Sequence, residues 1–131
     1  MKILVNRLLV PTLSGDGKQK KPHYIAYTDW GNRQNSHVVI CVHGLTRNCR
    51  DFDYLARALQ SNCRVICVDV VGRGRSDWLE HAHDYDYYPL YLSDAMLLVA
   101  HIQTQYHTKI TLDWVGISMG GLIGMMLAIQ P

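Results

Sequence analysis

The sequence lacks the features that would assign it to a membrane or to nucleic acid. No apolar run approaches the roughly 18 residues that span a bilayer. The apolar stretch over 3–10 is broken by Asn6 and Arg7, and no small-residue cleavage pattern follows it, which argues against a secretory leader. Like charges form no block, and 13 Lys and Arg against 11 Asp and Glu leave a net charge of +2. We therefore expect neither a membrane nor a nucleic-acid partner.

Cysteine is also scarce. The four cysteines lie in apolar surroundings and form no paired CxxC motif: Cys41, Cys49, Cys63 and Cys67. This number and setting argue against a disulfide framework and against a zinc site. Cys63 and Cys67 would stand about 13 Å apart along one strand, too far for a disulfide. We expect core thiols and a reducing, cytoplasmic compartment.

What the chain does contain is the pattern of one α/β domain over residues 1–131. Unbroken apolar runs and a later β-rich segment predict buried strands over 38–42, 65–68 and 110–115. Apolar residues at helical spacing predict helices over 52–59, 91–102 and 119–130, the first capped by Asn48 or Asp51 and the second with Pro89 in its first turn. The alternation indicates a mostly parallel sheet flanked by helices, with His23 to Tyr27 pairing antiparallel at the N-terminal edge. Residues 14–22 are expected to form a surface turn between two early strands.

Three loops should meet at one edge of this sheet. They follow the predicted parallel strands and cover residues 43–48, 69–77 and 116–121. Ligands of open α/β sheets bind beyond the carboxyl ends of the strands. We therefore expect the chemistry of the chain at this edge.

The last of these loops carries the clearest motif. Gly116 to Gly120 reads G-x-S-x-G between a predicted strand and a predicted helix, the setting in which small residues allow a serine to occupy a sharp, strained turn. A bulky residue at either glycine would clash there. This pattern predicts Ser118 as a nucleophile, and the alternative is a tight turn with an incidental serine.

An oxyanion formed on attack by Ser118 would need preorganised N–H donors. Met119 would supply one, because the first N–H groups of a helix have no partner within the helix. Leu45 would supply the other, if Gly44 lets the chain reverse sharply after its strand. The alternative for His43 and Gly44 is a plain turn that ends a strand.

Three ordered motifs resemble the N-terminal part of an α/β-hydrolase-fold serine hydrolase. They are His43-Gly44-Leu45-Thr46, Asp69-x-x-Gly72-x-Gly74-x-Ser76 and Gly116-x-Ser118-Met119-Gly120-Gly121. The resemblance covers the whole chain. It implies hydrolysis of an ester, thioester, lactone or related acyl or C–C bond of a small molecule through an acyl-enzyme on Ser118, with no metal and no organic cofactor. Relatives with an Asp or Cys nucleophile are disfavoured by Ser118.

The triad of this family, in the order nucleophile, acid, histidine, is not completed in the sequence. The thirteen residues after Ser118 contain no His, Asp or Glu. The resemblance therefore implies that the chain is the N-terminal part of a single domain, truncated after the helix that follows the nucleophile elbow. It also implies that the acid and the His lie in a missing C-terminal region and that this chain alone is inactive. His43 is the alternative base, disfavoured because its position in the family supports the oxyanion turn.

The competing hypothesis is a non-catalytic chain that acts only by association with another chain. Without further strands, the strand over 110–115 would be an exposed edge. The helix over 119–130 would then leave apolar side chains exposed. We expect the isolated chain to aggregate, to self-associate through this C-terminal edge, or to need the rest of its polypeptide.

Other polar segments have less specific interpretations. Residues 72–76 lack the third glycine and the lysine of phosphate loops and are expected to pack beside the hydrolase site. Residues 81–84 lack a second pair of zinc ligands and are expected to form a solvated loop. Arg47 and Arg50 could hold a substrate carboxylate but are more typical of surface or capping arginines. The role of Asp113 is left open.

Overall fold

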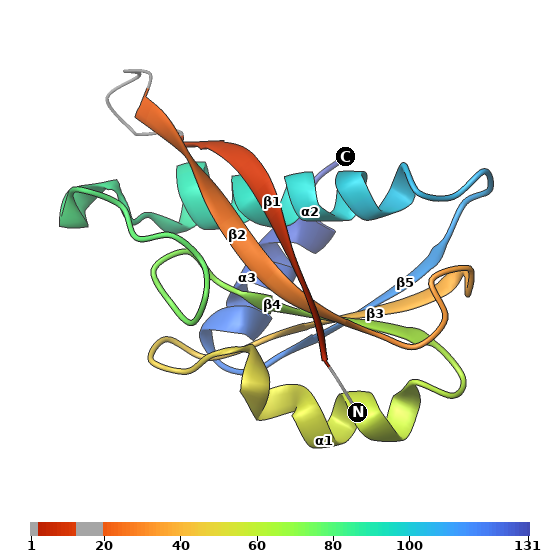
Figure 1. The fold of residues 1–131 in the computed structure, drawn as a ribbon. Coiled ribbons are helices and arrows are strands. Elements are labelled where there is room, and N and C mark those ends of the chain that lie inside the picture. Colours follow the sequence, from red (N-terminus) through yellow and green to blue (C-terminus); the bar gives the residue numbers. More distant parts are fainter. Residues whose placement is uncertain (1–2, 13–19) are drawn as a thin grey trace.

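The computed structural model describes residues 3–12 and 20–131, which form a twisted sheet between two layers of helix (Figure 1). The strands run over β1 Leu4–Thr12, β2 Lys20–Trp30, β3 His37–Val42, β4 Arg64–Asp69 and β5 Thr111–Gly116. The α-helices run over α1 Asp53–Leu59, α2 Ser93–Gln103 and α3 Met119–Ala128. In Figure 1, α1 covers one face of the sheet, whereas α2 and α3 cover the other.

The strand order is β1-β2-β4-β3-β5. β3 pairs in parallel with both β4 and β5, and β2 pairs antiparallel with both β1 and β4. This arrangement confirms the parallel strands predicted from the sequence and the antiparallel pairing at the N-terminal side. Residues 14–19 of the predicted turn lie outside the described residues, and Lys20 to Pro22 already belong to β2.

The α1 face of the sheet holds every cysteine of the chain. All four are buried and unpaired, and they pack with Trp30 and Phe52 in one cluster. Burial raises the pKa of the Cys49 thiol to about 12, so this sulfur stays protonated and unreactive at neutral pH. The prediction of core thiols is confirmed.

The helix entries differ in detail from the prediction. Of the two proposed caps, Asn48 is used: its side chain accepts the Arg50 N–H at 2.9 Å, ahead of a short 3-10 turn over Cys49–Phe52. Ahead of α2, residues 87–92 form a π-helical turn. Pro89 therefore lies in this wider turn rather than in the first turn of an α-helix, because proline lacks an N–H and its ring crowds the preceding turn.

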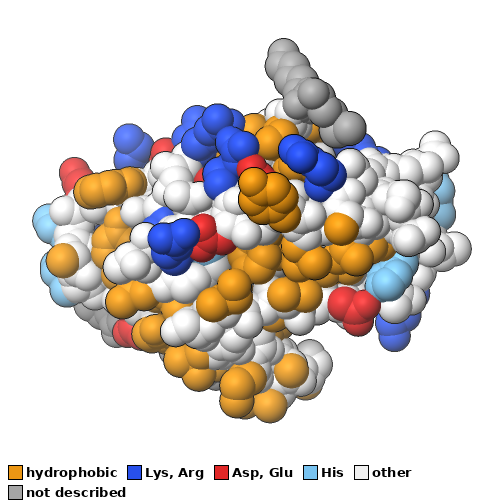
Figure 2. Space-filling view, turned by 90° about the horizontal axis from the view of Figure 1, so that it is seen from below, with side chains coloured by type: hydrophobic (Ala, Val, Ile, Leu, Met, Phe, Trp, Pro, Cys, Tyr) orange, Lys and Arg blue, Asp and Glu red, His pale blue; other side chains and the backbone are white. Residues whose placement is uncertain are grey.

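The last strand and helix are the least covered part of the fold. Three of the six residues of β5 are exposed, and on α3 the exposed fractions reach 44% for Leu122, 69% for Met125 and 80% for Ile129. Figure 2 shows hydrophobic side chains gathered at the lower edge of the view with no charged side chain among them. Within the described part of the chain, no helix is long and apolar enough to cross a membrane.

Candidate active site

Two of the predicted loops meet at the carboxyl ends of the parallel strands. A Cβ placed on Gly44 would lie 3.8 Å from the Ser118 Cβ and 3.7 Å from the Ile117 carbonyl oxygen. The Ile117 N–H also donates to the Val42 carbonyl oxygen at 3.1 Å. The turn after β3 thus packs directly against the turn after β5.

Ser118 occupies a strained turn between β5 and α3. Its backbone has φ 52° and ψ −112°, and it is the one non-glycine residue with positive φ in the described segments 3–12 and 20–131. Such a conformation costs on the order of 1–3 kcal/mol. The surrounding packing holds it, because the Ser118 carbonyl oxygen accepts the Leu122 N–H at 3.0 Å as α3 begins. The hydroxyl-bearing residue itself is exposed.

The two glycines of the motif are required by close backbone approach. A Cβ on Gly120 would overlap the Val42 carbonyl, and a Cβ on Gly116 would overlap the backbone of Gly120 and Gly121. Gly44, in contrast, does not have a positive φ, and its added Cβ would make only ordinary contacts. The expectation that Gly44 is needed for a sharp reversal is therefore corrected: what it leaves is space in front of Ser118.

The two predicted oxyanion donors follow these turns. Met119 is the first residue of α3, so its N–H has no carbonyl one turn back within the helix. Leu45 follows Gly44 in the turn that packs against the elbow, and its side chain is 55% exposed. Both residues thus lie in the turns that border the serine.

His43 is fully buried, and both of its ring nitrogens are engaged. Nδ1 donates to the Gly44 carbonyl oxygen at 2.7 Å, and Nε2 accepts the Val70 N–H at 3.0 Å. Burial lowers the pKa of this imidazole, which keeps it neutral and able to accept that N–H. His43 therefore joins the loops after β3 and β4 and has no nitrogen left to take a proton from Ser118.

The loop after β4 is folded around the carboxylate of Asp69. This carboxylate accepts the Cys49 N–H at 2.8 Å and the Arg75 N–H at 3.0 Å. The Ser76 hydroxyl donates to the Asp69 carbonyl oxygen at 2.5 Å. The N–H groups of Gly72, Arg73 and Ser76 donate to carbonyl oxygens within the loop, and that of Arg75 donates to Asp69. The segment is therefore a packed loop and not a phosphate cradle.

The remaining polar candidates have partners of their own. Arg47 forms two hydrogen bonds with Asp51 at 2.9 and 2.8 Å, which lowers the pKa of the Asp51 carboxyl group. Arg50 donates to Asp53 at 2.5 Å. Asp113 is exposed on β5 and pairs with His37 at 2.6 Å, so the question of its partner is answered.

The rings of His81 and His83 stack on each other with centroids 5.2 Å apart. Across the described ranges 3–12 and 20–131, no group of three or more His, Cys, Asp or Glu residues is arranged to hold a metal ion.

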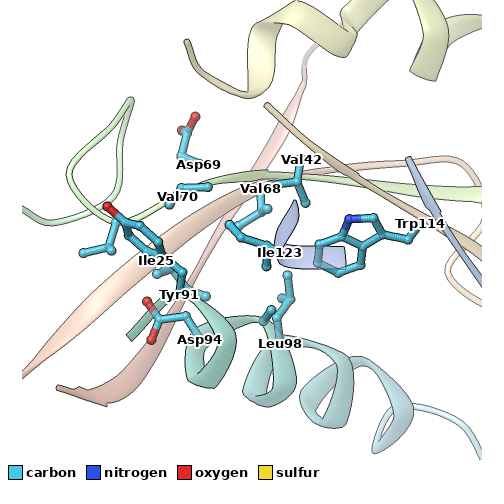
Figure 3. A pocket seen from close by; sticks show the side chains of 12 residues that line it. Ile25, Val42, Val68, Asp69, Val70, Tyr91, Asp94, Leu98, Trp114 and Ile123 are labelled. Carbon is cyan, nitrogen blue, oxygen red and sulfur yellow. The ribbon is translucent and has the colours of Figure 1, made fainter. Parts of the chain in front are cut away.

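A cavity of about 30 Å³ lies between the sheet and the helices α2 and α3. Trp114, Ile123 and Leu98 point toward one another across it (Figure 3). Asp94 lies at its border, where burial raises the pKa of the carboxyl group and His23 binds it at 2.7 Å. This space suits about one water molecule, so it is too small for a substrate.

Comparison with known proteins identifies the family of the chain. A hydrolase family model described as serine aminopeptidase, S33, matches residues 33–131. The chain belongs to this family. It has the α/β-hydrolase fold. The match begins just before β3 and includes all three loops of the site.

Individual relatives extend the comparison. A 3-hydroxybutyrate-oligomer hydrolase from Cupriavidus necator is 50% identical over 109 residues, which are 83% of this chain and 35% of the relative. A solved protein of Rickettsia typhi is 33% identical with a TM-score of 0.85, over 95% of this chain and 43% of that one. An α/β hydrolase from Novosphingobium aromaticivorans is 32% identical with a TM-score of 0.70, over 95% of this chain and 39% of that one. The chain thus spans well under half the length of these proteins.

Sequence reasoning missed one element of the site. The sequence shows Arg73 only as part of the loop over 72–76, yet its side chain donates to the carbonyl oxygen of Leu45 at 2.9 Å. Only the fold brings these residues, 28 positions apart, into contact. The one available signal was the position of Arg73 between two glycines of the loop after β4.

Proposed function

We propose that the chain carries the nucleophile and the oxyanion donors of a serine hydrolase. The observation that carries this proposal is the backbone of Ser118, a non-glycine residue held at positive φ between β5 and α3. A protein bears such strain where the surrounding structure over-determines it, as at an active site. The turn exposes the serine side chain at the sheet edge.

In the proposed reaction the Ser118 Oγ attacks the carbonyl carbon of an ester, thioester or lactone. A histidine accepts the Oγ proton as the Oγ–C bond forms, and the carbonyl electron pair moves onto the oxygen. The N–H groups of Met119 and Leu45 stabilise this oxyanion. Its collapse breaks the bond to the leaving group, which takes the proton from the histidine. Water then cleaves the acyl-enzyme by the same steps and restores Ser118.

The base of this reaction is not His43, because both of its ring nitrogens are engaged. No His, Asp or Glu occurs after Ser118 in the sequence. We propose that the catalytic acid and histidine follow Pro131 in the full-length polypeptide, in the order typical of the fold. The 131-residue chain is then expected to show negligible turnover. Robust turnover by this chain, lost in His43→Ala, would overturn the assignment.

The substrate proposed is a small ester of a hydroxy acid. The relative at 50% identity acts, by its name, on 3-hydroxybutyrate oligomers. Within the range of ester, lactone and thioester substrates, this likeness favours an oligomeric 3-hydroxyacyl ester. Release of 3-hydroxybutyrate from its dimer and trimer, compared with hydrolysis of p-nitrophenyl butyrate by the full-length enzyme, tests the preference. A higher kcat/KM for the aryl ester than for both oligomers would contradict it.

The nucleophile is tested with a fluorophosphonate probe on the full-length protein. We expect labelling at Ser118, and loss of both labelling and turnover in Ser118→Ala. Ser36→Ala is the matched control, because Ser36 is exposed just ahead of β3, at the opposite edge of the sheet. Wild-type activity in Ser118→Ala would contradict the proposal.

A second candidate is a chain that acts only in association with another polypeptide. The observation that favours it is the exposure of β5 and of the apolar residues Leu122, Met125 and Ile129 on α3. Edge strands and apolar patches of this kind promote association. Sedimentation of the 131-residue chain at low micromolar concentration tests it. A monodisperse monomer with cooperative melting and no binding of a hydrophobic dye would contradict self-association.

A further inference from the structure

The Arg73 side chain joins three segments of the fold, one of which is the turn that carries Leu45. The Arg73 Nε donates to the Leu45 carbonyl oxygen at 2.9 Å. Its Nη1 donates to the Val71 carbonyl oxygen at 2.8 Å and to the Tyr91 hydroxyl at 3.0 Å. The loop after β4 is thereby fastened to the turn after β3 and to the π-helical turn that precedes α2.

The guanidinium group is itself held in one orientation. Its carbon lies 5.5 Å from the centre of the Tyr91 ring and 6.0 Å from that of the Tyr85 ring, within the range of cation–π attraction. The neighbouring residues Gly72 and Gly74 both have positive φ, which most side chains avoid. The short loop can therefore turn on both sides of Arg73 and direct it across the sheet edge.

The side chain of Leu45 contributes little packing that could hold this residue in place. Its side chain is 55% exposed, unlike the buried His43 and Gly44 that precede it. The Gly44 carbonyl oxygen is held by the His43 ring at 2.7 Å and by the Arg47 N–H at 3.1 Å. On the far side of Leu45, the carbonyl oxygen is held by Arg73. The peptide unit that contains the Leu45 N–H is thus held through the Gly44 carbonyl, and the peptide unit that follows is held by Arg73.

We propose that Arg73 is a positioning residue for the oxyanion hole: it holds the carbonyl side of Leu45, so that the N–H on the other side of this residue keeps its direction. The inference rests on the proposed function, since it assigns a role relative to the oxyanion that Ser118 would create. Arg73 acts through Leu45 and does not touch the substrate. Donors stabilise an oxyanion most when they are oriented before the charge develops. Loss of Arg73 should therefore lower kcat and leave KM nearly unchanged, since the ground-state carbonyl carries little of that charge.

The experiment compares Arg73→Gln and Arg73→Lys with Arg75→Gln in the full-length enzyme. Arg75 lies two residues away in the same loop with an exposed side chain, so its variant controls for loss of charge. We expect kcat for a small ester to fall about 10- to 100-fold in Arg73→Gln, somewhat less than the loss of a whole oxyanion donor. KM should change less than threefold, and Arg75→Gln should match wild type. Lysine cannot donate along the same directions as the planar guanidinium, so Arg73→Lys should recover only part of kcat.

The inhibition constant Ki of a boronic acid distinguishes a positioning role from a purely structural one, because a purely structural role would not change it. The tetrahedral adduct of this inhibitor places a negative oxygen in the oxyanion hole, so its Ki should rise in Arg73→Gln by the same factor as kcat falls. Unchanged kcat and Ki in a folded Arg73→Gln enzyme would overturn the proposal. If that variant fails to fold, Arg73→Lys decides, because it keeps the charge but cannot donate along the same directions: lower kcat at constant KM supports the role, and wild-type kcat overturns it.

The same experiment separates this inference from the proposed function. Fluorophosphonate labelling of Ser118 in the wild-type enzyme is required for both. Absence of labelling in wild type contradicts the nucleophile and the positioning role together. Normal labelling in wild type with an equal labelling rate in Arg73→Gln contradicts the positioning role alone.

Discussion

β4 and β5 flank the same strand and pair with it in the same direction, yet their surroundings differ. All six residues of β4 are buried, whereas β5 exposes three of six. β4 lies between β2 and β3, while β5 pairs, among the described strands, with β3 at the end of the order. The comparison shows that parallel pairing alone does not bury a strand: neighbours on both edges and helices on both faces are needed.

This difference divides the candidate site into two parts. The loops after β3 and β4 are held by hydrogen bonds of two buried side chains, His43 and Asp69, and of the partly exposed Arg73 guanidinium. The turn after β5, which carries Ser118, is exposed. The turn that would supply one oxyanion donor, Leu45, is thus braced within the described chain, whereas the turn that would carry the nucleophile and the other donor, Met119, rests on β5 and α3.

The largest expected effect on the free energy of unfolding comes from breaking a charge pair, and it should differ between β4 and β5. At the start of β4, the Arg64 guanidinium binds Asp29 through two hydrogen bonds of 2.9 and 2.7 Å, and both side chains are 1% exposed. Asp29→Ala should lower the free energy of unfolding by about 3–5 kcal/mol, because it leaves a buried charge without its partner. Denaturant unfolding of the full-length protein measures this loss.

The matched variant is Asp113→Ala on β5. The Asp113 side chain is 61% exposed in its pair with His37, so its removal should cost less than about 1 kcal/mol. Similar losses in the two variants would contradict the contrast between the strands.

The second prediction concerns the close contact between α3, which follows Ser118, and the end of β3. Gly120→Ala would drive a Cβ into the Val42 carbonyl at the end of β3, and we expect a loss of about 2–4 kcal/mol. Gly121→Ala is the control, because its Cβ would come no closer than 3.3 Å to the Gly116 carbonyl oxygen. Thermal unfolding of both variants should separate them, and equal melting temperatures would contradict the close packing of α3 on β3.

The third prediction is that His43, in the turn after β3, makes the stability of the protein depend on pH. Burial lowers the pKa of His43 in the folded protein from the ordinary value of 6.5. Below 6.5 the unfolded chain therefore binds a proton that the folded chain excludes, so stability is lost as the pH falls through 6.5 toward the lowered pKa. The slope from this group is at most about 1.4 kcal/mol per pH unit.

Denaturant midpoints measured between pH 7.5 and 5.5 test this dependence. Replacing the exposed His107 by Gln should leave the slope unchanged. A stability that does not change over this pH range would argue against a neutral, buried His43.

The smallest expected effect measures the strain at the elbow. Glycine adopts positive φ without steric cost, so Ser118→Gly should be more stable than Ser118→Ala by about 1 kcal/mol. Both variants lack the hydroxyl, so their difference isolates the backbone. Denaturant unfolding of the two proteins gives that difference, and an alanine variant at least as stable as the glycine variant would indicate that Ser118 is not strained.

Much of the fold could be predicted because its central strands are unbroken runs of apolar, mostly β-branched residues. The β-branched run over 38–42 matches β3, and the run over 65–68 lies within β4, since buried parallel strands need apolar residues on both faces. The turn over residues 87–92 was harder to predict. Its π-helical form depends on how Pro89 is accommodated before α2, and local helical spacing does not record that.

The candidate site shows the same division. G-x-S-x-G marked Ser118 because the glycines are needed wherever strand and helix approach this closely, as Gly120 and Val42 do. No sequence pattern indicates the contact of Arg73 with Leu45, because an arginine in a loop has many possible partners.

The sequence by itself determined the order of strands and helices, the position of the serine between two glycines, and the burial of the cysteines. These follow from local periodicity and from the space that each residue type occupies. The tertiary structure alone decided that His43 is engaged at both nitrogens, that Asp113 pairs with His37 and that Arg73 holds Leu45. Each of these depends on distances between residues far apart in the chain, and hydrogen bonds form only where the packed sheet brings such groups within about 3 Å.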